Sequence, residues 1–166
     1  MSVVVDITEI SAIVAAAGVL VGVVYYILDM RQQTKLRQTD ILSGFYSRIT
    51  EREFLEAWKR FFEFDAKDPV AFIEKHGSVN FFTIDNNMVL AMFDQVGVLL
   101  MRKLVDINLV DPFLRDHVYL LWEKAKPFVE DMRKTYPMPN QGIGLEYLYN
   151  EMKKREQQLQ EGVKNG

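Results

Sequence analysis

The 166-residue chain contains no cysteine, and this absence removes several kinds of site at once. Without thiols there can be no disulfide, no cysteine nucleophile, no thiolate zinc site and no iron–sulfur cluster. A surplus of basic charge is also lacking, because the net charge is −3 and the sequence pI is near 5.5. Broad nucleic-acid binding needs a strongly basic surface, so we predict none. The 49% hydrophobic content excludes disorder of the whole chain.

Histidine is scarce as well, and the two histidines lack the neighbours that helical metal sites need. Di-iron bundles place a glutamate three residues before a histidine, whereas Ile73 precedes His76 and Leu114 precedes His117 at that spacing. No serine after residue 30 lies in the Gly-x-Ser-x-Gly pattern of a hydrolase nucleophile. We therefore predict no metal, no cofactor and no catalytic residue, and expect a protein that is not an enzyme.

Charge is missing altogether from one long segment near the N-terminus. Residues 10–28 form a run of nineteen uncharged residues, and as a helix they would extend roughly 28 Å, close to the ~30 Å hydrocarbon core of a bilayer. Tyr25 and Tyr26 fall at its end, where aromatic rings favour the headgroup level. A buried core helix is the alternative, but such helices seldom have more than about 14 wholly apolar residues. The sequence predicts a transmembrane helix over residues 10–28.

Basic residues are absent before this segment, which bears on its orientation. Asp6 and Glu9 precede it, and a cleaved signal peptide would need positive charge there, so a signal anchor is favoured. All 20 lysines and arginines lie after residue 30, with Arg31, Lys35 and Arg37 close to the apolar segment. By the positive-inside rule we expect a single-pass protein of the cell membrane. Residues 1–9 would form a short extracytoplasmic tail, and the C-terminal part would be cytoplasmic.

Three small residues of the predicted transmembrane helix fall on one stripe. Gly18 and Gly22 are four residues apart, and Ala15 lies close to the same stripe. Small residues at this spacing let two helix backbones approach closely, so the stripe is a candidate helix–helix interface. The alternative is the ordinary composition of a membrane helix rich in alanine and glycine.

The remainder of the chain shows helical rather than strand patterns. Residues 29–40 are polar on nearly every face and read as a stalk or linker that continues the preceding helix. Residues 41–161 contain amphipathic segments with apolar residues at spacings of three and four, and no alternating run bounded by hairpin turns. We predict an all-α protein, a single N-terminal transmembrane helix followed by a cytoplasmic helical bundle. Residues 162–166 would be a frayed tail.

Several helix starts are expected from local capping signals. The spacing from Thr50 to Glu53 is that of a capping box. Asp68 and Asp111 are each followed by proline, which predicts an N-cap and a first helical residue at both places. Pro127 is expected to kink or restart the second of these helices, because its ring removes a backbone donor.

The C-terminal helix is expected from about residue 145, after a loop over residues 136–144. Its apolar face would include Leu145, Leu148, Tyr149, Met152 and Leu159. The Gly-Ile-Gly stretch that ends the loop favours a turn and helix cap, although its backbone N–H groups could also hold an anion.

Asp94 is the one carboxylate set in a strongly apolar segment, within a helix expected over residues 88–104. Its neighbours three and four residues away are Leu90, Ala91, Gly97 and Val98. A carboxylate in such surroundings must pair, protonate or face a cavity. Asp94 is therefore a possible buried polar site, either a ligand or proton site or a structural residue. In the structural interpretation it pairs with a basic residue of another helix or occupies a slot at the bundle surface.

Four stretches carry a resemblance to a known type of protein: ILDMRQQTKLRQTDIL, GVLLMRKLVDINLV, LWEKAKPFVEDMRK and LEYLYNEMKKREQQL. They resemble an uncharacterised prokaryotic family of short proteins with one N-terminal transmembrane helix and a cytoplasmic all-helical domain of unknown function. The resemblance covers nearly the whole chain and is loosest around residues 67–87. It implies the same topology and assigns no site residue.

These observations favour a membrane-anchored module for protein–protein interaction or scaffolding at the cytoplasmic membrane face. Its partners would be the lipid bilayer together with another protein or a second copy of the chain. The alternative is a ligand-binding sensor domain that signals through its membrane helix and has a pocket near Asp94. An enzyme assembled from distant residues, or an accessory subunit of a membrane complex, is also left open.

Overall fold

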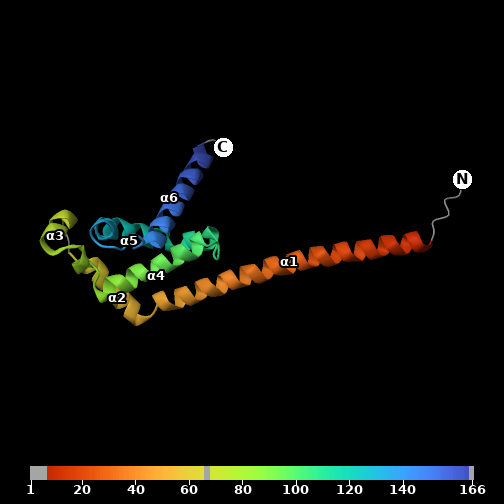
Figure 1. The fold of residues 1–166 in the computed structure, drawn as a ribbon, viewed down its shortest axis with the longest axis horizontal. Coiled ribbons are helices and arrows are strands. Elements are labelled where there is room, and N and C mark those ends of the chain that lie inside the picture. The colour runs from red at the N-terminus through yellow and green to blue at the C-terminus, as the bar shows by residue number, and fades with distance from the viewer. Residues whose placement is uncertain (1–6, 66–67, 165–166) are drawn as a thin grey trace. The chain divides into compact units, whose positions relative to one another are not determined.

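The computed structural model describes residues 7–65 and 68–164, which form helices joined by short turns and loops and contain no strand (Figure 1). The predicted all-α class is therefore confirmed over the described residues. The helices are α1 (Ile7–Ile49), α2 (Arg52–Glu63), α3 (Pro69–His76), the 3₁₀-helix η1 (Ser78–Phe81), α4 (Ile84–Met101), α5 (Ile107–Thr135) and α6 (Ile143–Lys164).

The chain divides into two compact units, residues 1–40 and 41–166. Most of α1 belongs to the first unit, and its last turns, residues 41–49, belong to the second. We call the described part of the first unit, residues 7–40, the N-terminal helix segment, and the second unit the helical domain. The expectations for residues 1–6 lie outside the described residues.

The N-terminal helix segment is one uninterrupted helix that continues through the polar residues 29–40. Its polar side chains bond along the helix: Thr34 Oγ1 donates to the Met30 carbonyl at 2.8 Å, and Gln33 Nε2 donates to Asp29 Oδ2 at 2.7 Å. The apolar part has a mean hydropathy of 2.3, and none of it is buried within the chain. The expected helix, long and apolar enough to cross a membrane, is confirmed.

Helix α4 is the centre of the helical domain, and its apolar sequence explains why. It packs most extensively against α6 and next against α2, while α5 packs against α6 and η1 (Figure 1). The buried residues of α4 are Asn86, Val89, Leu90, Phe93, Val96, Gly97 and Leu100, which lie on more than one face. A helix that is apolar on most sides must be surrounded by other elements.

A cluster of aromatic rings packs η1 and α5 against α2 and α3. The rings of Phe81 in η1 and Phe128 in α5 stack with centroids 4.0 Å apart and an interplanar angle of 4°. Phe61 of α2 and Phe72 of α3 meet these two rings edge to face. Four elements are thus joined through one set of ring contacts, each worth about 1 kcal/mol beyond the area that it buries.

The cap predicted at Asp68 is confirmed. Asp68 Oδ1 accepts hydrogen bonds from the backbone N–H groups of Val70 and Ala71 at 3.0 and 3.1 Å, and Pro69 is the first helical residue. Helix α3 ends at His76, and Gly77 follows with a φ of 76°, a conformation that favours glycine.

The capping box predicted from Thr50 to Glu53 is wrong. Residue Glu51 is the N-cap of α2 and makes no side-chain cap bond. The Thr50 hydroxyl instead donates to the carbonyls of Ser47 at 2.8 Å and Tyr46 at 3.3 Å. Because α1 ends one residue earlier, this hydroxyl lies over the final turn of α1 and satisfies carbonyls there.

The helix start predicted at Asp111 is also wrong. Helix α5 begins five residues earlier, where Asp106 Oδ1 accepts from the Asn108 N–H at 2.8 Å. Pro112 and Pro127 both lie inside α5, which neither restarts nor ends before Thr135. Each proline removes one intrahelical hydrogen bond, and the long buried face of α5 supplies the packing that keeps the helix continuous.

Helix α6 begins two residues before the expected position and continues to Lys164, so the tail predicted to fray is helical over residues 162–164. Its expected apolar face is buried at Leu145, Leu148 and Met152 and half-buried at Tyr149. Leu159 is 54% exposed and does not belong to the core, because the last turns of α6 extend beyond the helices that cover its beginning.

Candidate functional site

The carboxylate of Asp94 caps a neighbouring helix. Asp94 lies in the middle of α4 and is half-buried, and its Oδ1 accepts hydrogen bonds from the backbone N–H groups of Gly144 at 2.8 Å and Leu145 at 3.0 Å. These are the second and third residues of α6, whose N–H groups have no partner within the helix. Gly142 precedes α6 and has no side chain to accept them, so Asp94 takes the role of an N-cap residue.

Two glycines bring the α4 and α6 backbones together at this point. A Cβ atom on Gly97 would lie 1.8 Å from the Gly144 carbonyl oxygen, and one on Gly144 would lie 2.2 Å from the Asp94 carbonyl oxygen. Neither position has room for a side chain. The close approach places the Asp94 carboxylate within hydrogen-bond distance of the α6 N-terminus.

Asp94 and the glycine-containing start of α6, two separate features in the sequence, therefore contact each other. The backbone N–H groups that could hold an anion at the start of α6 hold the carboxylate of Asp94. The partner of Asp94 is thus a pair of backbone N–H groups and not the basic side chain considered from the sequence. The partial positive charge at the N-terminus of α6 also attracts the carboxylate. Asp94 thus has a structural contact that sequence spacing did not indicate.

A shallow hollow of about 260 Å³ adjoins this junction. Its lining residues are Asn87, Leu90, Ala91, Asp94, Val129, Asn140, Gln141 and Gly142. The loop on one side is held by Arg133, whose Nε donates to the Gln141 carbonyl at 2.8 Å and whose Nη1 donates to Glu146 at 2.6 Å. The volume is slightly below that of a typical small-molecule site, and binding of a ligand near Asp94 stays a prediction.

A larger hollow of about 550 Å³ lies among α2, α3 and α5. Its lining residues are Phe62, Glu63, Phe64, Asp65, Pro69, Glu123, Lys124 and Phe128. Lys124 Nζ donates to the Phe62 carbonyl at 2.9 Å, and burial lowers the pKa of this amine. Aromatic walls with three carboxyl groups and one amine would suit an organic cation better than an anion.

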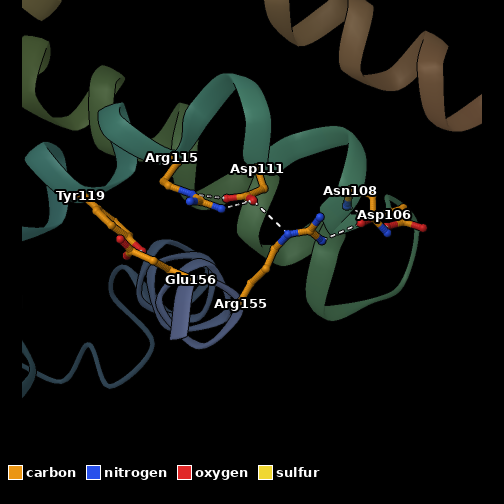
Figure 2. Close-up of polar contacts among 7 residues, drawn as sticks. All are labelled: Asp106, Asn108, Asp111, Arg115, Tyr119, Arg155 and Glu156. Atoms are coloured by element: carbon orange, nitrogen blue, oxygen red, sulfur yellow. Dashed lines mark hydrogen bonds and ion pairs between the residues drawn. The ribbon is translucent and has the colours of Figure 1, made fainter. Parts of the chain in front are cut away.

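Asp111 anchors the most buried charged cluster in the described chain (Figure 2). Its side chain is 4% exposed and lies between two guanidinium groups, Arg115 of the same helix and Arg155 of α6. Arg115 donates to both carboxylate oxygens, with Nε 2.8 Å from Oδ1. Arg155 Nε lies 3.0 Å from Oδ2 as an ion pair, without hydrogen-bond alignment. The cluster ties α5 to α6.

Polar contacts extend this cluster in both directions (Figure 2). Arg155 Nη1 donates to Asn108 Oδ1 at 2.6 Å, and the Tyr119 hydroxyl donates to Glu156 at 3.0 Å. Burial and the Glu156 carboxylate raise the pKa of Tyr119 to about 12. The sequence did not predict this cluster, because the Asp111–Pro112 pair indicated a helix cap. The four-residue spacing from Asp111 to Arg115 was the signal that could have indicated the ion pair.

The predicted helix–helix stripe of α1 is uncovered in the single chain. Ala15, Gly18 and Gly22 are all exposed, and a Cβ atom on either glycine would meet nothing within 4 Å. The stripe is thus free to contact another helix, and its role in self-association stays a prediction.

The two histidines take part in aromatic contacts. The His117 ring lies 5.4 Å from Trp58, and the His76 ring lies 5.0 Å from Phe72. Among the described residues there is no group of three or more His, Asp or Glu side chains that could hold a metal ion.

Comparison with known proteins identifies the family of this chain. No curated protein and no solved structure matches it. A family model described as "Domain of unknown function (DUF4760)" matches residues 12–152, which include most of α1 and the helical domain as far as Met152 in α6. The expectation of an uncharacterised family is confirmed, and the chain belongs to the DUF4760 family.

Proposed function

We propose that α1 anchors the protein in a membrane and that the helical domain recruits a protein partner at the cytoplasmic face. One observation carries the proposal: the most apolar part of the chain is a helix with none of its residues buried. Leu20, Val21 and Tyr25 are each at least 66% exposed. An apolar surface of this extent is unfavourable in water and favourable in hydrocarbon.

The charges that flank the apolar segment support a cytoplasmic helical domain. Arg31, Lys35 and Arg37 follow the segment on the helix that continues into the domain, and acidic residues precede it. Lysine and arginine near one end of a membrane helix keep that end in the cytoplasm. The N-terminus would then face outward.

Exposed apolar side chains on the helical domain support a role in protein binding. Leu55 of α2 and Leu120 of α5 are 52% and 58% exposed although both helices bury another face. Such side chains offer contact area to a partner. A second copy is one candidate partner, through the stripe of Ala15, Gly18 and Gly22.

The absence of native cysteine allows a direct test of topology. Ser2→Cys and Glu161→Cys variants of the full chain each place one thiol at one end. With a membrane-impermeant maleimide we expect the Ser2→Cys variant to react in intact cells and the Glu161→Cys variant to react only after permeabilisation. The reverse pattern would contradict the orientation. Release of the unmodified protein from membranes by alkaline carbonate would contradict anchoring itself.

Self-association through the small-residue stripe has its own test. Gly18→Leu should reduce crosslinked dimers of the full chain in mild detergent, because a large side chain separates the helix backbones. Ala16→Leu is the matched control, since residue 16 lies on the opposite face of α1. Equal crosslinking of both variants and the unmodified protein would show that this stripe is not the interface.

The sensor role is the second candidate, favoured by the 550 Å³ hollow among α2, α3 and α5. It predicts that a small organic cation raises the unfolding temperature of the detergent-solubilised protein by mass action. Glu63→Gln should abolish this shift, and Glu53→Gln on the same helix should not. If no amine in a panel of metabolites raises the unfolding temperature, the sensor role is excluded and the protein-interaction role remains.

A further inference from the structure

The turn between α4 and α5 combines exposed apolar and basic side chains. Arg102 and Lys103 are exposed, and no ion pair joins either to another described residue. Four large apolar side chains within ten residues of Lys103 in the chain are also exposed, namely Met101 (40% exposed), Leu104 (42%), Leu109 (37%) and Phe113 (65%). We call these six residues the turn surface.

The backbone holds one half of the turn surface in a defined shape. The Lys103 N–H donates to the Leu100 carbonyl and the Leu104 N–H to the Leu99 carbonyl, both at 2.9 Å, which is the Schellman ending of a helix. Lys103 takes the left-handed conformation, with φ of 56°, where glycine is usual. The turn therefore presents a lysine at the position where helices commonly end in glycine.

The start of α5 supplies the other half. Leu109 and Phe113 are four residues apart and so share one side of the helix. The Phe113 ring meets Tyr46 at 5.4 Å between centroids and still leaves most of its surface exposed. Tyr46 belongs to the last turns of α1, so the turn surface adjoins the place where the chain enters the helical domain.

We propose that the turn surface rests on the anionic headgroups of the bilayer that holds α1; the inference depends on the membrane anchoring proposed above. The order apolar, basic, basic, apolar from Met101 to Leu104 suits the interface, where cationic groups meet lipid phosphates and apolar side chains enter the acyl boundary. Residues 29–40 are twelve helical residues, so the helical domain begins about 18 Å along the helix from the end of the apolar run.

Charge complementarity favours lipid over a protein partner. The chain as a whole is acidic, with a net charge of −3, yet the turn surface carries two positive charges and no acidic side chain. The nearest carboxylate in sequence, Asp106, accepts two hydrogen bonds from Asn108. Anionic lipid attracts such an isolated basic pair, and the attraction weakens in neutral lipid.

The test uses the full chain in nanodiscs that contain a lipid-borne fluorescence quencher. Three single-cysteine variants carry the same fluorophore: Val19→Cys in the apolar part of α1, Leu104→Cys in the turn surface, and Leu120→Cys, an equally apolar exposed position on α5 outside the turn surface. In discs with roughly one-third phosphatidylserine we expect quenching at residues 19 and 104 and little at residue 120. In phosphatidylcholine discs the quenching at residue 104 should fall by about fivefold or more.

A charge reversal provides the second arm. Arg102→Glu with Lys103→Glu, placed in the Leu104→Cys background, should lower the quenching in anionic discs to the level in neutral discs. The matched control is Lys153→Glu with Lys154→Glu, which reverses another exposed basic pair, on α6. The control pair should leave the quenching at residue 104 unchanged.

The outcomes separate the two proposals. Quenching at residue 19 without quenching at residue 104 overturns the lipid contact and leaves anchoring intact. No quenching at residue 19 overturns anchoring. Quenching at residue 104 that ignores lipid charge, or that equals the quenching at residue 120, overturns the recognition of anionic headgroups. Fluorophore burial at residue 104 without lipid quenching indicates a protein contact and likewise overturns the inference.

Discussion

The Asp94 carboxylate of α4 caps α6: its Oδ1 accepts a hydrogen bond at 2.8 Å from the backbone N–H of Gly144, fifty residues later in the chain. The contact requires Gly97 and Gly144, because a Cβ on either would overlap backbone atoms of the other helix. One carboxylate and two glycines thus fix the relative position of α4 and α6, the most extensive helix pair of the domain.

Removing the Asp94 carboxylate should destabilise the domain. Asp94→Ala leaves the N–H groups of Gly144 and Leu145 without their acceptor, and we expect a loss of about 1 kcal/mol in the free energy of unfolding. Asp94→Asn retains a carbonyl acceptor and should lose less. Urea unfolding followed by tryptophan fluorescence measures both, with the exposed Asp116→Asn as control. An Asp94→Ala variant as stable as this control would show that the cap contributes nothing.

Adding one methyl group at the helix contact should be more damaging. Gly97→Ala places a carbon where the Gly144 carbonyl lies, so α4 and α6 must separate, at an expected cost of about 3 kcal/mol or more. Gly44→Ala is the control, and we expect it to raise stability. A Cβ atom at residue 44 would meet nothing within 4 Å, and alanine favours a helix over glycine by about 0.5–1 kcal/mol. Thermal unfolding by circular dichroism should therefore shift in opposite directions for the two variants. A shared direction would contradict the close approach.

The buried carboxylate of Asp111 should matter far more than exposed ion pairs. Asp111→Asn leaves Arg115 and Arg155 facing each other without a negative charge, and we expect a loss of about 2–3 kcal/mol. This is less than the roughly 3–5 kcal/mol expected for a fully buried pair, because the two arginine side chains are 28% and 30% exposed. Arg52→Gln, which breaks a pair with Glu56 at a side chain 93% exposed, should change stability by less than about 0.5 kcal/mol. If Asp111→Asn and Arg52→Gln lower the free energy of unfolding equally in denaturant, burial does not strengthen the Asp111 ion pairs.

Tyr119 should titrate well above an ordinary tyrosine. Burial and the Glu156 carboxylate raise its pKa from the ordinary 10.0 to about 12, so folding favours the neutral hydroxyl. This contribution to stability is fully present below pH 10 and is lost as the pH rises through the folded pKa. The near-ultraviolet absorbance titration of the protein minus that of Tyr119→Phe should show the high transition. Glu156→Gln should move it toward 10.0, and an unmoved transition would exclude Glu156 as a cause.

Local capping chemistry was predictable from sequence only where no other helix competes. Asp68 and Asp111 are both followed by proline, yet Asp68 caps a helix and Asp111 lies inside one. The two positions look alike in sequence. They differ in the fold: Asp106 caps α5 five residues before Asp111, and α6 brings Arg155 to Asp111, a contact between residues forty-four apart that no local spacing encodes.

The candidate site shows the same limit. The sequence marks Asp94 as a polar residue in apolar surroundings and the glycine-containing start of α6 as a possible anion cradle. It does not show that the two meet, because their contact depends on how α4 packs against α6. The turn surface could not be predicted for a related reason: Arg102 and Lys103 look like any solvated pair until the exposure of the apolar side chains near them in the chain is known.

The amino-acid order alone determined the helical class and the uncharged N-terminal helix, since both follow from residue periodicity, length and hydropathy along a single segment. Tertiary structure decided what the buried polar groups do. A carboxylate in an apolar helix needs a partner, and whether that partner is a backbone N–H, as for Asp94, or two guanidinium groups, as for Asp111, depends on which distant segment the packing places beside it.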